Sequence, residues 1–220
     1  MITKSAHKLV VFEGIDGSGK SEQLVRLKAW LSECGMQVAV PASEPSRIRR
    51  FYRELISREE EFPSALTSTL ISLGDYADLV SAWERSAAGG VTVLHRYIYS
   101  AVSDAVALGL QLGPLLEVAA TFPKPSVTIW IDTPEALALA RKRTISLAEA
   151  GGPEFLRGHR DRAKGFLDYQ SRVRTAYESI FKSLPCGTLV RVDGSGDADS
   201  VHRKVRHELG GFIPWLEAAS

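Results

Sequence analysis

The stretch LVVFEGIDGSGKS, residues 9–21, constrains the fold of this chain more than any other part of it. Residues 9–12 are apolar and predict a short buried strand, and residues 14–21 fit the pattern G-x-x-x-x-G-K-[ST] at every fixed position. The glycines of such a loop let backbone N–H groups approach phosphate oxygens, and the helix that begins there adds its positive dipole end. The sequence therefore predicts a nucleotide-phosphate site between a strand and a helix.

The polar side chains of this loop have expected tasks. Lys20 can place its charge on the β- and γ-phosphates of a nucleotide, and the Ser21 hydroxyl can hold Mg²⁺. The residues expected to bind the phosphates are Gly14, Gly17, Ser18, Gly19, Lys20 and Ser21. Because a strand is predicted before the loop and a helix after it, a glycine-rich turn that binds nothing is the less favoured interpretation.

Composition limits the class of protein. A length of 220 residues suggests one domain, or one domain with a small lid. The 27 Lys and Arg against 26 Asp and Glu leave a formal net charge of +1, so bulk charge does not call for a nucleic-acid or membrane partner. Cys34 and Cys186 form neither a metal-binding spacing nor a disulfide framework. With no apolar run near the roughly 18 residues of a membrane span, we expect a soluble cytoplasmic protein.

Short apolar segments alternate with helical patterns along the chain. Further strands are predicted at residues 37–42, 91–94, 126–131 and 189–192, and helices at residues 22–33, 47–57, 165–183 and 200–209. A long helix is opened by Pro63-Ser64 and stopped by Gly89-Gly90. Its expected apolar face is Leu66, Leu70, Leu73, Ala77, Val80 and Trp83. Another helix is expected to begin with Thr133 as N-cap and Pro134 in its first turn, and to end at residues 141–143.

Five apolar strands between helices predict an α/β fold with a parallel sheet covered on both faces. Ligands bind such sheets at the carboxyl ends of the strands. The residues that follow the strands are the phosphate loop, residues 43–45, residues 95–97, Asp132 and Asp193. Residues 144–164 have weak periodicity and central glycines, which favours a mobile lid.

The ordered set of motifs resembles the thymidylate kinases, a branch of the nucleoside-monophosphate kinases. The resemblance rests on FEGIDGSGKS, the Glu-Pro of residues 44–45, the Arg-Tyr-x-x-Ser of residues 96–100, IWIDTPEALAL, FLDYQSRVRTAY and VDGSGD. It covers residues 8 to about 209. It implies a single P-loop NTPase domain of three α/β/α layers with a five-stranded parallel sheet, a lid at about 144–164, ATP and Mg²⁺ as cofactors, a nucleoside 5′-monophosphate as acceptor, and usually a homodimer.

The resemblance also implies roles for charged residues. Some members of the family carry an arginine in the phosphate loop and others carry it in the lid; because Gly17 occupies the loop position, the charge is expected from Arg143 or Arg141. Arg96 matches the arginine that grips the acceptor phosphate, a task suited to a guanidinium. Asp16 matches an aspartate near the acceptor sugar and the metal. The expected catalytic residues are Lys20, Asp16, Arg96 and Arg143, and Asp16 and Arg141 join the ATP-binding set.

Departures from the family pattern gather in the acceptor site. His95 stands where the family has an aspartate, and it could add a titrating group beside Mg²⁺. Residues 74–76 hold no base-reading arginine, and Asp104 replaces a tyrosine that crowds the ribose 2′-hydroxyl. The expected acceptor-binding residues are Glu44, Arg47, Leu70, His95, Arg96, Tyr97, Ser100 and Asp104. Because the ATP end keeps the family pattern, we hypothesise an active kinase whose acceptor is not plain dTMP.

Other functions stay open from the sequence alone. A kinase that acts on a nucleoside within DNA, or on another non-nucleotide acceptor, is suggested by four arginines between residues 47 and 53, but the near-neutral net charge argues against it. A non-catalytic ATP-binding module, with the acceptor side disabled by His95, would bind ATP without releasing ADP. Simple hydrolysis of ATP lacks an obvious water-positioning residue.

Overall fold

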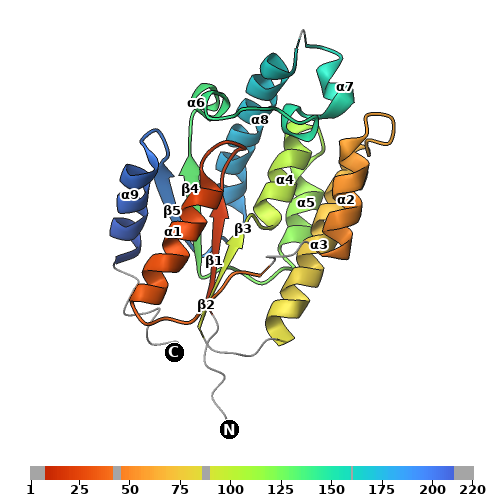
Figure 1. The fold of residues 1–220 in the computed structure, drawn as a ribbon. Helices are drawn as coiled ribbons and strands as arrows, with labels where there is room; N and C mark the ends of the chain where they lie inside the picture. The colour runs from red at the N-terminus through yellow and green to blue at the C-terminus, as the bar shows by residue number, and fades with distance from the viewer. Residues whose placement is uncertain (1–7, 42–45, 86–89, 160, 211–220) are drawn as a thin grey trace.

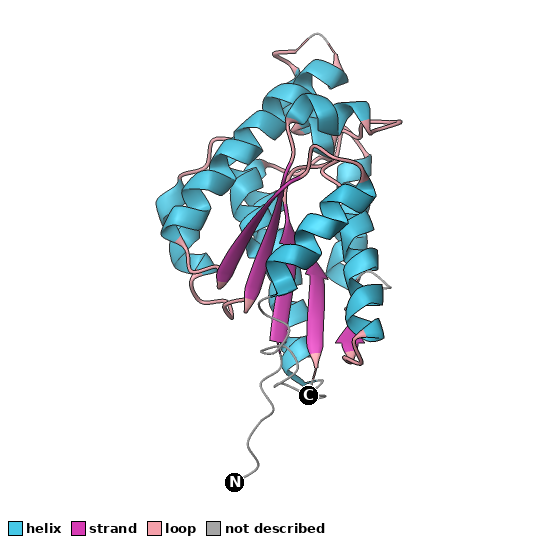
Figure 2. Cartoon of the chain, turned by 90° about the vertical axis from the view of Figure 1, so that its left-hand side faces the viewer, coloured by secondary structure: helices cyan, strands magenta, loops and turns pink. Residues whose placement is uncertain are grey.

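A computed structural model describes residues 8–41, 46–85, 90–159 and 161–210 of the chain (Figure 1). In this part of the chain five parallel strands form one sheet, in the order β2-β3-β1-β4-β5. The strands are β1 (Lys8–Glu13), β2 (Val38–Ala39), β3 (Val91–His95), β4 (Val127–Asp132) and β5 (Thr188–Asp193). Figure 2 shows the sheet between two layers of helices. The predicted three-layer α/β fold with a five-stranded parallel sheet is therefore confirmed.

The helices connect the strands and cover both faces of the sheet. They are α1 (Lys20–Glu33), α2 (Arg47–Ser57), α3 (Ala65–Arg85), α4 (Ile98–Ala107), α5 (Leu112–Ala119), α6 (Glu135–Ala140), the 3₁₀ turn η1 (Ala148–Ala150), α7 (Gly152–Leu156), α8 (Arg162–Ser183) and α9 (Ala198–Gly210). Helices α1 and α9 cover one face, and α3, α4, α5 and α8 cover the other (Figure 1). None of the helices in the described ranges is long and apolar enough to cross a membrane.

The alternation of side chains along β1 divides the interior into two apolar cores. Val10 and Phe12 pack with the residues of α1 and α9, whereas Leu9 and Val11 pack with those of α3, α4 and α8. Because both faces of the strand are covered, β1 is a continuous apolar run rather than an alternating one. Because β1 is the central strand of the five, the phosphate loop that follows it begins at the middle of the carboxyl edge of the sheet.

Several element boundaries differ from the predicted ones. Strand β2 is limited to Val38–Ala39, and Pro41, which follows it closely, has no N–H to extend the ladder. Helix α6 begins at Glu135 after Pro134, and Thr133 does not cap it: the Thr133 hydroxyl instead donates to the Ser18 carbonyl oxygen, 3.4 Å away. Helix α8 begins at Arg162 because the Asp161 carboxylate accepts from the Lys164 N–H at 2.8 Å.

The spacing of apolar residues does not reveal a helix that is buried on every side. Eight of the ten residues of α4 are buried, so its sequence shows no polar face from which a helix could be predicted. The face predicted for α3 is partly wrong: Leu73 and Val80 are in the core, but Leu66 and Leu70 are exposed. Polar Thr69 is buried on that helix instead, because its hydroxyl donates to the Ala65 carbonyl.

Candidate active site

The phosphate loop lies between β1 and α1, as its pattern predicts. Gly17 and Gly19 have φ angles of 79° and 95°, a region that favours glycine. Gly19 precedes the first turn of α1, so the free N–H groups of that turn face the loop. The local backbone therefore has the form of an anion cradle at the carboxyl edge of the sheet.

Lys20 is enclosed within this loop. Its ammonium donates to the Ile15 carbonyl oxygen at 2.6 Å and to the Ser18 hydroxyl at 3.2 Å. Burial, together with the nearby Arg96 cation, lowers the pKa of Lys20 to about 7. A phosphate anion in the loop would favour the charged form of Lys20, so this side chain is poised to bind phosphate.

Gly17 also faces a steric limit. A Cβ atom at this position would lie 2.5 Å from the Ala138 carbonyl oxygen of α6, whereas a Cβ at Gly19 would have no atom within 4 Å. A side chain at position 17 would therefore meet the backbone of α6, whereas one at position 19 would meet no neighbour.

This difference between two glycines gives a matched test. We expect Gly19→Ala to destabilise the protein by about 1–2 kcal/mol, the usual cost of a left-handed backbone conformation in a residue with a Cβ. Gly17→Ala should lower the melting temperature clearly more, because the backbone clash adds to the same conformational cost. Thermal unfolding of the two variants measures this difference. Equal losses would show that the loop does not approach α6 as closely as described.

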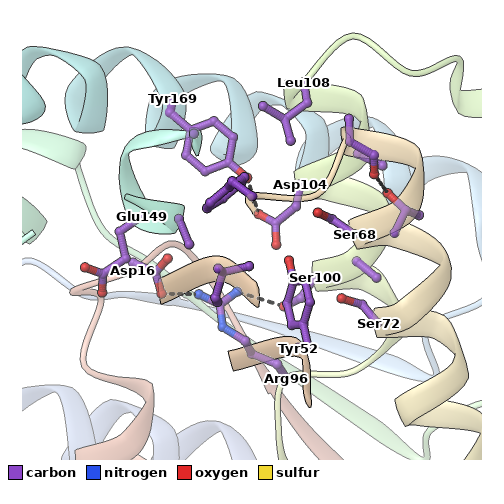
Figure 3. Close-up of a pocket in the computed structure, with 18 of the residues that line it drawn as sticks. Asp16, Tyr52, Ser68, Ser72, Arg96, Ser100, Asp104, Leu108, Glu149 and Tyr169 are labelled. Carbon is purple, nitrogen blue, oxygen red and sulfur yellow. Dashed lines mark hydrogen bonds and ion pairs between the residues drawn. The ribbon is translucent and has the colours of Figure 1, made fainter. Parts of the chain in front are cut away.

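Arg96 lies where β3 passes into α4, at the carboxyl edge of the sheet. Among the described residues it is the one non-glycine residue with a positive φ, at 70°. Its guanidinium forms an ion pair with the Asp16 carboxylate through Nη2 and donates to the Ser100 hydroxyl through Nη1 at 2.9 Å (Figure 3). A strained backbone that aims a cation between the phosphate loop and a cavity is typical of functional sites.

Asp16 is the anionic partner in this arrangement. Burial would raise its pKa, but Arg96 and Lys20 outweigh that effect and lower it to about 2, so the carboxylate stays ionised at neutral pH. The Asp16 N–H donates to the Gln170 side-chain oxygen at 3.0 Å, and the Gln170 amide nitrogen donates to the Glu149 carbonyl oxygen at 2.9 Å. Gln170 thus joins the phosphate loop to α8 and η1, a role that sequence reasoning missed.

A cavity of about 220 Å³ opens beside Arg96, between α2, α3, α4, α8 and η1. Its charged lining residues are Asp16, Arg49, Arg96, Asp104 and Glu149. Its hydroxyl-bearing lining residues are Tyr52, Ser68, Thr69, Ser72, Tyr76, Ser100 and Tyr169. Figure 3 shows Ser68 and Ser72 on the wall that faces Asp104 and Tyr169. The cavity can therefore hold a polar molecule whose anionic end meets Arg96.

Asp104 lies one helical turn beyond Ser100 on the cavity wall. The Tyr169 hydroxyl donates to its Oδ1 at 3.0 Å. Burial raises the pKa of Asp104 to about 6, against the effect of Arg96, so the carboxylate is mostly ionised at pH 7 and above. Asp104 thus presents a hydrogen-bond acceptor on the cavity wall.

Arg49 rather than Arg47 lines the cavity. Arg47 is exposed, whereas Arg49, two residues along the same helix, forms an ion pair with Asp75 of α3 and lies over the Tyr76 ring, 5.5 Å from its centroid. Residues 74–76 hold no arginine themselves, but α2 supplies one to the same wall. Of the four arginines of this stretch, Arg49 alone turns toward the cavity, while Arg47, Arg50 and Arg53 stay exposed.

Two more predicted acceptor residues do not lie in the cavity. Leu70 is 59% exposed and is not part of the cavity lining. Tyr97 is fully buried, and its hydroxyl donates to the Pro123 carbonyl oxygen at 3.1 Å, so it packs in the core rather than against a ligand. Glu44 lies outside the described residues.

His95 contacts the phosphate loop directly. Its Nε2 shares a hydrogen bond with the Ser21 hydroxyl, 3.0 Å away. Desolvation by the surrounding protein, and the Lys20 and Arg96 cations, lower the pKa of His95 to about 3. These effects favour the neutral form of the ring in this arrangement.

The three basic residues after α6 have different surroundings. Arg141 donates from Nη2 to the carbonyl oxygens of Gly194 and Gly196, each at 2.8 Å, at the end of the sheet that carries β5. Arg143 is exposed. Lys142, which the sequence did not single out, forms an ion pair with Glu149 and helps to lower the pKa of Asp16. Of the three, Lys142 is the residue that the structure links to the cavity.

The aspartates that end β4 and β5 have structural partners. Asp132 pairs with Arg174 and Arg191, and Asp193 pairs with Lys204 at 2.7 Å. These ion pairs fasten the sheet edge to α8 and α9.

The arrangement of loop, arginine and cavity can be compared with known proteins. The family model for thymidylate kinase matches residues 12–205. The chain belongs to the thymidylate kinase family. It is 31% identical to a probable thymidylate kinase 2 of Saccharolobus solfataricus, with 93% of this chain and 96% of the relative covered, and 30% identical to a thymidylate kinase of Chlorobaculum parvum, with 91% and 94% covered. A probable thymidylate kinase of Pyrococcus abyssi is 28% identical, with 92% and 98% covered.

Membership of the thymidylate kinase family establishes the class of reaction. The chain is an ATP-dependent nucleoside-monophosphate kinase that phosphorylates dTMP or a related nucleotide. Its co-substrate is ATP, and the acceptor is a small molecule. The predicted class of enzyme is therefore confirmed, and the non-catalytic module is not supported.

Proposed function

We propose that the phosphate loop holds the triphosphate of ATP while Arg96 presents the 5′-phosphate of a nucleotide bound in the cavity. The position of Arg96 carries this proposal, because its side chain reaches both Asp16 of the loop and the cavity wall. A guanidinium has five N–H donors, and its two described bonds leave others for a phosphate. The two substrates would thus meet at the carboxyl edge of the sheet, where α/β folds bind ligands.

Catalysis of this transfer depends on positioning and positive charge rather than on a protein nucleophile. Lys20 and the loop amides are placed to neutralise the donor phosphates, and Arg96 the acceptor phosphate. We propose that residues 144–164 act as the lid, whose closure excludes water and brings Arg143 toward the transferred group. Arg141, bound to the β5–α9 turn, would lie on the ATP side.

The residues present fit a magnesium ion bound mainly through ATP. Mg²⁺ prefers oxygen ligands and usually takes few from the protein, with water and substrate phosphates supplying the rest. In the described part of the chain no group of three or more His, Cys, Asp or Glu could hold a metal, but the Ser21 hydroxyl stands at the start of α1, oriented by His95. We propose Ser21 as the protein ligand; the ion would neutralise charge on the phosphates.

The acceptor cavity favours a nucleotide with more hydroxyl groups than dTMP. Ser100 marks the phosphate end because it contacts Arg96, and Asp104 follows one turn along α4, about 6 Å away. That spacing places Asp104 at the level of the sugar of a bound nucleotide. Its second carboxylate oxygen can accept a hydroxyl that a 2′-deoxy sugar lacks, so we propose a ribonucleotide, or a similarly hydroxylated nucleotide, as the preferred acceptor.

A panel of nucleoside monophosphates tests this proposal. In an assay of ADP release, we expect the ribo form of an acceptor to exceed its 2′-deoxy form in kcat/KM by about 10-fold or more, the effect of one hydrogen bond to a charged group. Asp104→Ala should remove that preference and leave the KM for ATP unchanged. Turnover of dTMP far above every other acceptor would contradict the proposed preference, but not the kinase assignment.

Two further proposals rest on the family resemblance alone. We propose that two copies of the chain form a homodimer and that the protein works in the cytoplasm. Sedimentation equilibrium of the purified protein would measure the first, and fractionation of cells the second.

A further inference from the structure

Glu13, the last residue of β1, is a carboxylate buried completely beneath the active site. Its Oε1 accepts from the Tyr97 N–H at 2.8 Å. Its Oε2 accepts from the Ser100 hydroxyl at 2.5 Å and from the Tyr177 hydroxyl at 2.8 Å. None of the roles proposed above uses Glu13, although a charged group without access to water is costly unless it is well paired.

Two of these bonds lead directly to Arg96. Because the Ser100 hydroxyl donates its proton to Glu13, its oxygen lone pair is free to accept from Arg96 Nη1 at 2.9 Å. The Tyr97 N–H belongs to the peptide that follows Arg96, the residue with the strained φ of 70°. Glu13 therefore restrains both the backbone and the side chain of Arg96.

We propose that Glu13 is a positioning residue for the acceptor phosphate and acts through Ser100 and Tyr97 on Arg96. This inference rests on the proposed function of Arg96. Asp16 holds the guanidinium from the side of the phosphate loop, and the Glu13–Ser100 pair holds it from the side of α4. With both ends fixed, the remaining donors point in one direction before the acceptor arrives, and preorganisation of this kind strengthens binding.

The hydrogen-bond pattern explains why a carboxylate is required. Oε2 accepts from two hydroxyl groups at once, which an amide NH₂ in its place cannot do. In Glu13→Gln the Ser100 hydroxyl would have to turn its lone pair toward the new donor, and it would lose its fixed orientation toward Arg96. Burial raises the pKa of Glu13 to about 7, against the lowering effects of the Ser100 hydroxyl and the Arg96 cation, so the hydrogen bonds rather than a fixed charge carry this argument near neutral pH.

Steady-state kinetics of the full chain test the proposal. We expect Glu13→Gln to raise the KM for the acceptor about 10-fold and to leave the KM for ATP within about 2-fold, because a charged hydrogen bond is lost on the acceptor side alone. Tyr99→Phe is the matched control: it removes a hydroxyl from a buried tyrosine beside Ser100 on α4 that donates to the Pro185 carbonyl oxygen at 2.8 Å rather than to Glu13 or Ser100. Similar acceptor KM values in the two variants would overturn the proposal.

A double-mutant cycle separates the path from a general loss of packing. If Glu13 acts mainly through Ser100, the double variant Glu13→Gln/Ser100→Ala should have an acceptor KM close to that of whichever single variant has the higher acceptor KM. If the double variant instead raises the acceptor KM by the product of the two single effects, Glu13 does not act through Ser100. Should the Glu13 variant fail to fold, Ser100→Ala can be compared with Ser103→Ala. Ser103 is a buried serine on the same helix whose hydroxyl donates to the Ser100 carbonyl oxygen. Equal acceptor KM values in these two variants would refute the proposal.

The outcome is distinguishable from failure of the proposed function. If Arg96→Ala changes acceptor kinetics but Glu13→Gln does not, only the positioning role of Glu13 is wrong. If Arg96→Ala itself has no effect, the assignment of the acceptor phosphate fails first.

Discussion

Lys20→Ala should lower kcat by about 10²–10³-fold or more while the protein remains folded. The Lys20 ammonium is the cation enclosed by the phosphate loop, and loss of one preorganised group that stabilises transition-state charge costs about this much. Because the transferred phosphoryl group carries its charge on oxygens that the protein must neutralise, no other loop side chain can replace it. The measurement is ADP release with saturating ATP and acceptor, together with circular dichroism and thermal unfolding.

Lys28→Ala is the control for this experiment. Lys28 is on the same helix as Lys20 but is exposed to solvent, so its removal takes the same charge from the protein without touching the loop. We expect this variant to keep both activity and stability. If Lys20→Ala retained more than about a tenth of the wild-type turnover, the loop would not hold the transferred phosphate in the way proposed.

Arg96→Ala should raise the KM for the acceptor and lower kcat together, with a combined loss of about 10²-fold or more in kcat/KM. A buried guanidinium with charge-assisted bonds to a phosphate is worth about 1.5–3 kcal/mol per bond, and a bidentate grip makes more than one bond. Since alanine also has a Cβ, the variant keeps the backbone cost at φ 70° and removes the guanidinium together with its bonds to Asp16 and Ser100. The KM for ATP should change much less.

Two further variants test whether the effect comes from the guanidinium of Arg96. Arg96→Lys keeps the charge but lacks the planar fork, so we expect it to recover part of kcat and little of the acceptor KM. Arg50→Ala removes an exposed arginine from α2 and should behave as wild type. Unchanged acceptor kinetics in Arg96→Ala would mean that another group holds the acceptor phosphate.

The phosphate loop and the strands could be predicted because the information for them is local. Glycines with positive φ, a lysine and a serine at fixed spacing, and an apolar run before them all lie within 13 consecutive residues. The position of Arg96 at the carboxyl edge of the sheet could be predicted for a similar reason, since it directly follows an apolar strand. Helix α4 was missed because burial on all sides erases the periodicity that marks a helix.

The acceptor cavity was predicted less well because helical phase and partner choice decide it. Whether Arg47 or Arg49 faces the cavity depends on how α2 rotates against α3, and the Asp75 carboxylate fixes that rotation. Leu70 was expected near the base but is exposed, because Thr69 and Leu73 occupy the inner face of α3.

The sequence by itself determined the class of this protein: the phosphate loop, the parallel α/β sheet, the kinase family and the arginine at the end of β3. Tertiary structure alone determined which partners the polar groups of the site contact. It brings His95 against Ser21, buries Glu13 against Ser100 and Tyr177, and joins Asp16 to Gln170, 154 residues away. The physical reason is that backbone conformation and amphipathic pattern depend on neighbours in the chain, whereas the charge state and orientation of a buried polar group depend on partners that only folding brings together.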